Sequence, residues 1–526
     1  LTFLDTRLLK ILNDFEARYG MIVEKKITKE TMRPVSYHPA EHTPADCNNA
    51  RSSAMLDAVQ SADAAEHSID TESTETTASK LYHHLYEACN ILRGPIDQDD
   101  YKSYVIPLLF FKRISDVYDE ENVRNLQQYG EDIDLYPEDE LHVFIIPEGC
   151  HWVDVRNTSE DVGKAITDAM MGIEQANPEK LAGLFSSFDD ANWTDKTKLD
   201  DERLKDLVEH MSSLPVGNKN YSADVMGDAY EYLIKKFADM SKKNAGEFYT
   251  PRSIVKLMVQ LLQPKSGETV YDPACGTGGM LIEAIRNMDD PRAAYGKIYG
   301  QENNLSTSAI ARMNLYLHGA DEFHIVRSDT IWGSPTDSNA DFAWLQHMYK
   351  SMKPGTGRCA VVMPQGVLFH GGREGKIREK MIESDIVECV ITLVGNLFYG
   401  AGVSACILFL SNNKPLAHRG KICMVDATNT YTAQRAKNIM TESDIAEVYK
   451  LWTGYKNVID KCAVVDLETI RKGGHSLTVN SYIEKTPAPP MDPKKVRLEF
   501  MAALQQVQNC EAKLEKLLKE GGYIDG

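Results

Sequence analysis

The 526 residues of this chain include 43% hydrophobic and 26% charged residues, the composition of an ordinary globular protein with about three domains. No apolar run approaches the ~20 residues that a transmembrane helix needs, and the first thirty residues lack a signal-peptide core, which disfavours a membrane or secreted protein. The net charge of −19 disfavours strong nucleic-acid binding by the chain alone, because phosphate contacts need Lys and Arg. Either the basic residues gather on one face, or a partner supplies most of the contacts.

Ten cysteines are scattered along the chain without a single CxxC pair. Several of them, such as Cys359, Cys389 and Cys406, lie in apolar runs typical of strands. We therefore expect buried, reduced cysteines and no metal site.

Residues 1–79 are predicted to form an N-terminal helical extension followed by a polar linker. The stretch 65–79 (AEHSIDTESTETTAS) is acidic and rich in Thr and Ser, which favours a linker or exposed loop. Near the start of the chain, apolar side chains recur at helical spacing at Leu4, Leu8, Ile11, Leu12 and Phe15.

Residues 80–240 are predicted to form a helical domain. Leu81, Leu85, Ala88 and Leu92 keep helical spacing, and residues 104–114 form a second, strongly apolar helix. Residues 224–237 (DVMGDAYEYLIKKF) repeat the same pattern.

In residues 241–485, strand and helix patterns alternate, which is typical of an α/β domain with a doubly wound, largely parallel sheet. The short runs expected to be strands are 269–271, 297–300, 323–326, 359–363, 387–394, 405–410 and 422–425.

Residues 486–526 begin with a proline-rich segment that interrupts regular structure. Apolar side chains then recur near heptad positions. This pattern predicts an amphipathic helix for partner contact, although a helix packed on its own chain remains an alternative. The apolar positions are Phe500, Leu504, Val507, Leu514 and Leu518.

The strongest chemical signal is TVYDPACGTGGMLIEA, residues 269–284. A short strand ending at Asp272 leads through a glycine-rich turn into a helix, a geometry that brings backbone N–H groups against a ligand. Acids follow the next two strands, at Glu302 and Asp329. An acid after the second strand is placed to accept ribose hydroxyls and one after the third to meet an adenine amino group, so together they favour a nucleoside site.

Upstream lies GEFYTPRSIVKLMVQLL, residues 246–262. Thr250 is predicted as the N-cap and Pro251 as the first residue of a helix. Phe248 and Tyr249 directly precede that cap, where aromatic faces could contact a cofactor.

The motif GEFYTPR, followed about twenty residues later by DPACGTGG, closely resembles the N6-adenine DNA methyltransferases that serve as modification subunits of type I restriction-modification systems. DVMGDAYEYLI (224–234) and NLFYGAGVSACILFL (396–410) also resemble that family. The resemblance implies a Rossmann-like S-adenosylmethionine-dependent methyltransferase domain. It also implies these S-adenosylmethionine contacts: Glu247, Phe248, Tyr249, Thr250, Pro251, Asp272, Pro273, Ala274, Cys275, Gly276, Thr277, Gly278, Gly279, Glu302 and Asp329.

The resemblance further implies a function and partners. The chain would transfer a methyl group to a flipped-out adenine in double-stranded DNA. It would act in the prokaryotic cytoplasm with a separate sequence-specificity subunit, a second methyltransferase subunit and, in some assemblies, a restriction subunit. The acidity of the chain fits this division of labour.

One departure concerns catalysis. The family uses an Asn-Pro-Pro-aromatic motif at the end of a fourth strand, and no such motif stands between Asp329 and Ser338. A missing fourth strand would leave a gap in the middle of the sheet, with unpaired backbone groups. The favoured explanation is that a loop and strand are absent from the sequence as given, and the alternative is an inactive subunit that binds cofactor and partner. A dinucleotide oxidoreductase is a weaker alternative, because the turn does not read G-x-G-x-x-G.

Overall fold

The computed structural model describes residues 71–188, 191–240, 250–331, 340–398, 404–434, 437–487 and 493–520. The predicted helix around Leu4 to Phe15 lies outside these residues. No helix among them is long and apolar enough to cross a membrane.

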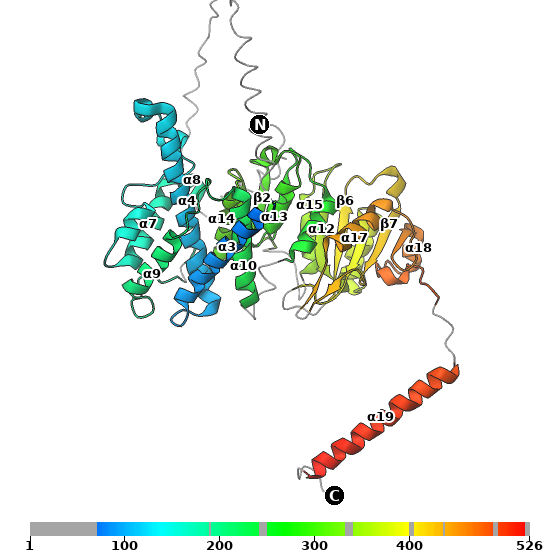
Figure 1. The fold of residues 1–526 in the computed structure, drawn as a ribbon. Helices are drawn as coiled ribbons and strands as arrows, with labels where there is room; N and C mark the ends of the chain where they lie inside the picture. The colour runs from blue at the N-terminus through cyan, green and yellow to red at the C-terminus, as the bar shows by residue number, and fades with distance from the viewer. Residues whose placement is uncertain are drawn as a thin grey trace, which may run out of the picture. The chain divides into compact units, whose positions relative to one another are not determined.

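The expected helical region is present (blue to green in Figure 1). Its longest helix is almost wholly apolar and buried between Tyr104 and Phe111, which makes it the centre of the core. The helices are α3 (Thr71–Leu92), α4 (Tyr101–Tyr129), α5 (Glu138–Leu141), α6 (Trp152–Asn157), α7 (Val162–Ala176), α8 (Pro178–Leu181), α9 (Asp201–Ser212) and α10 (Ala223–Met240), with 3-10 turns at Gln98–Asp100 and Gly130–Leu135.

The linker prediction is wrong for residues 71–79, because these residues belong to helix α3. Polar composition misled the interpretation, because the helix that buries Leu81, Leu85 and Leu92 continues through this Thr- and Ser-rich stretch, and tertiary packing overrides its weak helix propensity.

The first sheet has three strands, β1 (Val270–Asp272), β2 (Ile298–Glu302) and β3 (His324–Arg327). All pairs are parallel, and the order is β1-β2-β3. Helices α13 (Gly279–Arg286) and α14 (Leu305–Leu317) connect the strands, with a 3-10 turn at Pro291–Ala294.

The second sheet has five strands in the order β10-β7-β5-β6-β4. Strand β6 runs antiparallel between β5 and β4, and β10 runs antiparallel to β7, so only β5 and β7 pair in parallel. The expectation of a largely parallel arrangement therefore holds for the first sheet and is wrong for the second. The strands are β4 (Arg358–Pro364), β5 (Val387–Leu393), β6 (Ala405–Ser411), β7 (Lys421–Ala427) and β10 (Cys462–Asp466).

Helices and short elements surround the second sheet. Helix α17 packs on β7 and on α12, which also contacts β4. These elements are α12 (Arg252–Leu262), α15 (Asp341–Ser351), α16 (Gly372–Glu383), α17 (Glu442–Gly454), α18 (Leu467–Lys472), the hairpin of β8 (Thr432–Ala433) and β9 (Asn438–Ile439), and 3-10 turns at Gln365–Leu368, Leu416–His418 and Val479–Ser481.

Each sheet has an open edge where the missing fourth strand is expected. Strand β1 ends the first sheet and β4 ends the second, and neither has a backbone partner on its other side among the described strands. Side chains bridge the two halves: the Arg358 guanidinium of β4 pairs with the Glu268 carboxylate just before β1 at 2.7 Å, and the Tyr271 hydroxyl of β1 lies 3.0 Å from His347 Nε2 of α15.

The predicted C-terminal helix is present as α19 (Pro493–Glu520), drawn in red in Figure 1. Its apolar side chains are exposed, including Leu498 at 71% and Phe500 at 63%. Among the described residues, these side chains are not covered by other parts of the chain.

Candidate functional site

The glycine-rich turn forms a tight bend between β1 and α13. Gly276 and Gly278 have φ angles of 53° and 85°, in the left-handed region that side chains with a Cβ rarely adopt. The Gly278 N–H donates to the Cys275 carbonyl at 2.8 Å, and Gly278 is the N-cap of α13. A Cβ added at Gly279 would meet nothing within 4 Å, so the helix begins beside open space.

Glu302, the last residue of β2, connects the bend to this strand by hydrogen bonds. Its Oε2 accepts from the Gly276 N–H at 3.2 Å, and its Oε1 accepts from the Asn304 N–H at 2.8 Å. The Cys275 N–H donates to the Gln301 carbonyl at 2.9 Å, which adds a backbone bond to the same contact. The structure therefore brings the predicted acid of β2 directly against the predicted bend.

Asp272 ends β1 and lies half-buried beneath the bend. Its Oδ1 accepts from the Ala274 N–H at 3.0 Å. Burial raises the pKa of the Asp272 carboxyl to about 6, and the negative charge of Glu302 adds to the shift. Within the described part of the chain, neither carboxylate pairs with a Lys or Arg side chain, so the bend is an anionic site suited to a cationic ligand.

The segment after β3 turns back toward the bend. The Thr330 hydroxyl donates to the Pro273 carbonyl, and the Ser328 N–H donates to the Glu302 carbonyl at 3.0 Å. Asp329 stands between them, and its Oδ1 accepts from the Ile331 N–H at 3.1 Å. The ends of all three strands of the first sheet thus gather around one place.

The aromatic motif upstream is only partly visible, because Glu247, Phe248 and Tyr249 lie outside the described residues. The cap prediction is wrong by one position. Pro251 is the N-cap residue, its backbone is extended at ψ 131°, and the helix begins at Arg252 without a side-chain cap. The Pro251 carbonyl instead accepts the first helical N–H, from Ile254 at 2.8 Å.

Two residues at the site escaped the sequence interpretation. Asn314 of α14 donates through Nδ2 to the Thr277 carbonyl of the bend at 2.9 Å. Asn304 caps α14 by accepting from the Thr307 N–H at 3.0 Å. The available signal was an amide within the apolar stripe of α14, since a buried polar group normally has a specific partner.

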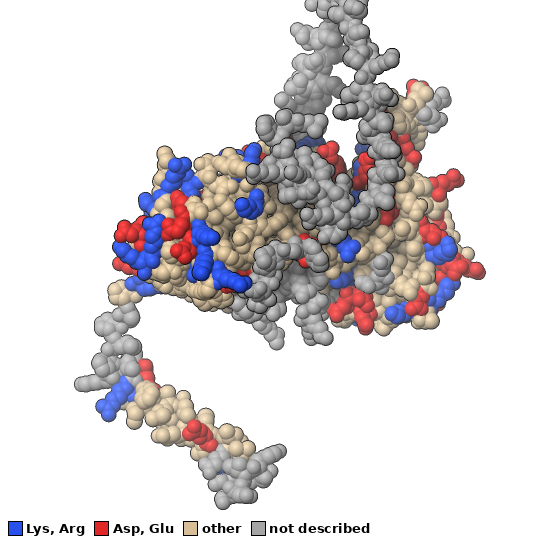
Figure 2. Space-filling model, turned by 180° about the vertical axis from the view of Figure 1, so that it is seen from behind, with Lys and Arg blue, Asp and Glu red and all other residues tan. Residues whose placement is uncertain are grey.

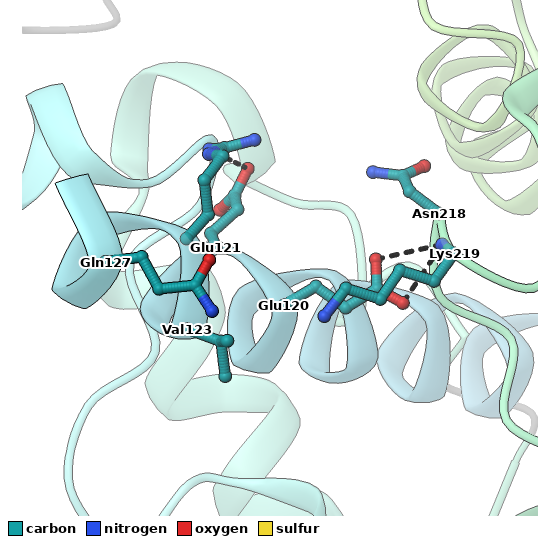
Figure 3. Close-up of a pocket in the computed structure, with 7 residues that line it drawn as sticks. Glu120, Glu121, Val123, Gln127, Asn218 and Lys219 are labelled. Atoms are coloured by element: carbon teal, nitrogen blue, oxygen red, sulfur yellow. Dashed lines mark hydrogen bonds and ion pairs between the residues drawn. The ribbon is translucent and has the colours of Figure 1, made fainter.

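A separate pocket lies in the helical region and contains no residue of the bend (Figure 3). The Glu120 carboxylate accepts from the Lys219 N–H there at 3.1 Å. The pocket is lined by Glu120, Glu121, Val123, Arg124, Gln127, Asn218 and Lys219, so acidic and basic groups already face one another across it.

Charge on the face shown in Figure 2 is mixed. Lys and Arg side chains lie among Asp and Glu side chains rather than apart from them. The described residues visible on this face therefore form no broad single-sign surface for phosphates.

Comparison with known proteins decides the family. A family model described as N-6 DNA Methylase matches residues 221–336 and 331–489, and a model described as HsdM N-terminal domain matches residues 81–211. The chain belongs to this methylase family. It is a modification subunit of the type I restriction-modification kind, and its methyl donor is S-adenosylmethionine.

Curated relatives agree with this assignment. The type I restriction enzyme MjaVIII methylase subunit of Methanocaldococcus jannaschii is 30% identical, over 87% of this chain and 86% of its own length. The type I restriction enzyme HindI methylase subunit of Haemophilus influenzae is also 30% identical, over 69% of this chain and 93% of its own length.

A solved structure supports the fold. The crystal structure of a type I restriction-modification system methyltransferase subunit from Streptococcus thermophilus matches with a TM-score of 0.67 and 25% identity, covering 78% of this chain and all of that one. The α/β methyltransferase fold with an N-terminal helical region is thereby confirmed.

The methylase match is divided at a point that lies between the two sheets in the sequence. Its two pieces meet at residues 331–336, between β3 and α15. The alignment with the Methanocaldococcus relative runs over 526 positions yet takes in only 87% of this chain, so that relative carries residues without a counterpart here. The family match thus divides between β3 and α15.

Proposed function

We propose that this methyltransferase subunit binds S-adenosylmethionine at the glycine bend and methylates adenine N6 in double-stranded DNA. The single observation that carries the proposal is the closure of the bend by Glu302, whose carboxylate accepts from the Gly276 N–H. That contact brings together a helix N-terminus and a carboxylate that would accept ribose hydroxyls.

The chemistry of the site fits the donor. S-adenosylmethionine carries a sulfonium and an ammonium group, and it supplies an electrophilic methyl when bound. Asp272 and Glu302 supply negative charge with no Lys or Arg partner among the described residues. The left-handed glycines and the open space beside Gly279 leave room for a ligand to approach the backbone.

The proposed donor contacts are the residues of the two motifs and the two acids. The 247–251 segment would cover the methionine end, the 272–279 bend would hold the nucleoside, Glu302 would accept the ribose hydroxyls, and Asp329 would meet the adenine amino group. Displacement of the methyl group onto adenine requires an acceptor for the N6 proton, and the motif that serves this purpose in the family has no counterpart in the printed sequence.

Partners would supply the sequence recognition and much of the DNA contact. The net charge of −19 and the mixed charges in Figure 2 favour a separate specificity subunit that contacts the phosphates. A second methyltransferase subunit and a restriction subunit complete the proposed assembly. The exposed apolar stripe of α19 is the proposed contact for a partner.

The function is tested by two measurements on the full chain. Calorimetry with S-adenosylmethionine should show one binding site, and transfer of a labelled methyl group to duplex DNA should require the specificity subunit. Digestion of the labelled DNA should return N6-methyladenine. Label recovered as methylcytosine would overturn the adenine assignment, and absence of donor binding would overturn the proposal as a whole.

A second candidate is a subunit that binds donor and partner without transferring the methyl group. The open edges of β1 and β4 and the absent catalytic motif favour it. Donor binding without any methyl transfer, in a complex with the specificity subunit, would select this candidate.

The partner contact is tested by deleting residues 493–526. We expect weaker assembly with the specificity subunit and unchanged donor affinity, because the apolar side chains of α19 are exposed. Assembly is measured by analytical ultracentrifugation of the mixed subunits. Assembly at full strength would show that α19 has no such role.

A further inference from the structure

We propose that Asn314 is a positioning residue of the methyl-donor site, which holds the glycine bend in its binding shape through the Thr277 carbonyl. The inference rests on the proposed function of the bend. It adds a residue that makes no contact with the donor and acts through the backbone that does.

The contact itself is short and completely enclosed. Asn314 is 0% exposed, and its Nδ2 donates to the Thr277 carbonyl at 2.9 Å. Thr277 is buried and lies between Gly276 and Gly278, which are both left-handed. The amide therefore fixes a peptide group in the most sharply turned part of the bend.

A buried amide side chain at position 314 lowers stability unless its hydrogen bonds compensate for the burial. Its Oδ1 has no hydrogen-bond partner among the described residues, and an unpaired buried acceptor opposes folding. Apolar neighbours on α14 surround it. Ala309, Ile310, Met313 and Leu317 join the core of the helical region, whereas Ala311 and Leu315 join the core beneath the bend.

Helix α14 thus connects the helical region with the donor site, and Asn314 stands at the connection. One turn later, His318 Nδ1 lies 2.8 Å from the Asn314 carbonyl. Burial lowers the pKa of the His318 imidazole to about 4, so at neutral pH the ring is uncharged and Nδ1 is the donor to that carbonyl.

The helical region also packs against α14 at His318. The His318 ring lies against Gly227 of α10, where an added Cβ would stand 2.3 Å from Nε2. Because the ring fills this space, the position of α14 is set by α10. The position of α14 in turn sets the position of the Asn314 amide, which holds Thr277.

The first test replaces Asn314 by leucine, which branches at the same carbon and has no polar atoms. Loss of one hydrogen bond should weaken S-adenosylmethionine binding by roughly 3- to 10-fold. In the assembled enzyme, KM for the donor should rise by the same factor while kcat at saturating donor is unchanged. The melting temperature should change little, because removal of the unpaired Oδ1 offsets the loss of the partner of the Thr277 carbonyl.

The second test uses Asn314→Asp, which separates the hydrogen bond from side-chain size. An ionised aspartate cannot donate to the Thr277 carbonyl, but a protonated one can. Donor affinity of this variant, divided by that of the parent at the same pH, should therefore rise as the pH falls. The leucine variant should show a flat ratio.

A matched control is Tyr230→Phe. Tyr230 is fully buried, and its hydroxyl lies 3.4 Å from Met313 Sδ on the same helix α14. This change alters packing on α14 without touching the bend, so donor affinity should equal that of the parent. A parent chain that binds no donor would overturn the proposed function. A parent that binds and an Asn314→Leu variant with equal affinity would overturn this inference alone.

Discussion

The two sheets differ in how much of each is enclosed. Every residue of β5 and β6 is buried, and each of these strands has a neighbour on both sides. In the three-stranded sheet, all of β1 is half-buried, and three of the four residues of β3 are exposed. The five-stranded sheet is therefore the more fully enclosed of the two, while the three-stranded sheet carries the proposed donor site.

This difference explains why we expect the proposed donor site to be stabilised by its ligand. A small sheet with an open edge has less apolar burial to hold it together. Ligand that binds only the folded form adds stability by mass action. Donor binding should accordingly stabilise the three-stranded sheet more than the five-stranded sheet.

The largest expected effect is from Gly276→Leu. A leucine at φ 53° is strained, and its side chain would stand in the bend. We expect donor binding, measured by calorimetry, to be lost. Gly420→Leu, which imposes similar strain at φ 69° before β7, should lower the free energy of unfolding by about 1–2 kcal/mol and leave the affinity unchanged. Equal affinity of Gly276→Leu and the parent would remove the bend from the site.

The next effect is on the other sheet, from Ile391→Ala. Ile391 is fully buried in β5, so the cavity should lower the free energy of unfolding by about 2–5 kcal/mol. Chemical denaturation measures this loss. Donor affinity of the folded variant should be unchanged, and a matching loss of affinity would show that the two sheets are not separable in this way.

Titration of Asp272 gives a smaller effect confined to the three-stranded sheet. Its pKa is raised to about 6, above the ~3.9 of an unfolded aspartate. Ionisation therefore opposes folding, and the free energy of unfolding should fall as the pH rises from about 4 to about 6. Donor affinity should rise over the same range, because the ionised carboxylate attracts the cationic ligand.

Asp272→Asn should flatten both pH profiles. The measurements are donor affinity by calorimetry and unfolding by denaturant at a series of pH values. Profiles that match the parent between pH 4 and 6 would assign the titration to another group.

The smallest effect is expected from Val326→Ser at the open edge. Val326 is 55% exposed in β3, so the free energy of unfolding should change by no more than about 0.5 kcal/mol. Val390→Ser, at a fully buried position of β5, is the matched comparison and should cost several times more. Similar losses at both positions would show that the edge of β3 is covered in solution.

Much of the fold could be predicted from the sequence because the strands are short apolar runs between clear breaks. The seven predicted strands agree with β1 to β7 to within two residues at each end. The bend was equally visible, since glycines between a strand and a helix have few other purposes. Glu302 followed from its place at the end of the next strand.

The remainder depends on contacts between distant residues. Nothing local shows that β6 enters its sheet antiparallel, because a fully buried strand lacks the alternation that marks orientation and face. The role of Asn314 was hidden for the same reason, since its partner Thr277 is 37 residues away. The start of α3 was misjudged because polar residues form linkers and exposed helices alike.

The most direct test of the central claim is a crystal structure of the full chain with S-adenosylmethionine. The donor should lie against residues 272–279, with its ribose hydroxyls on the Glu302 carboxylate and its positive charge facing Asp272. A donor bound elsewhere, or a bend filled by protein side chains, would contradict the assignment of this site.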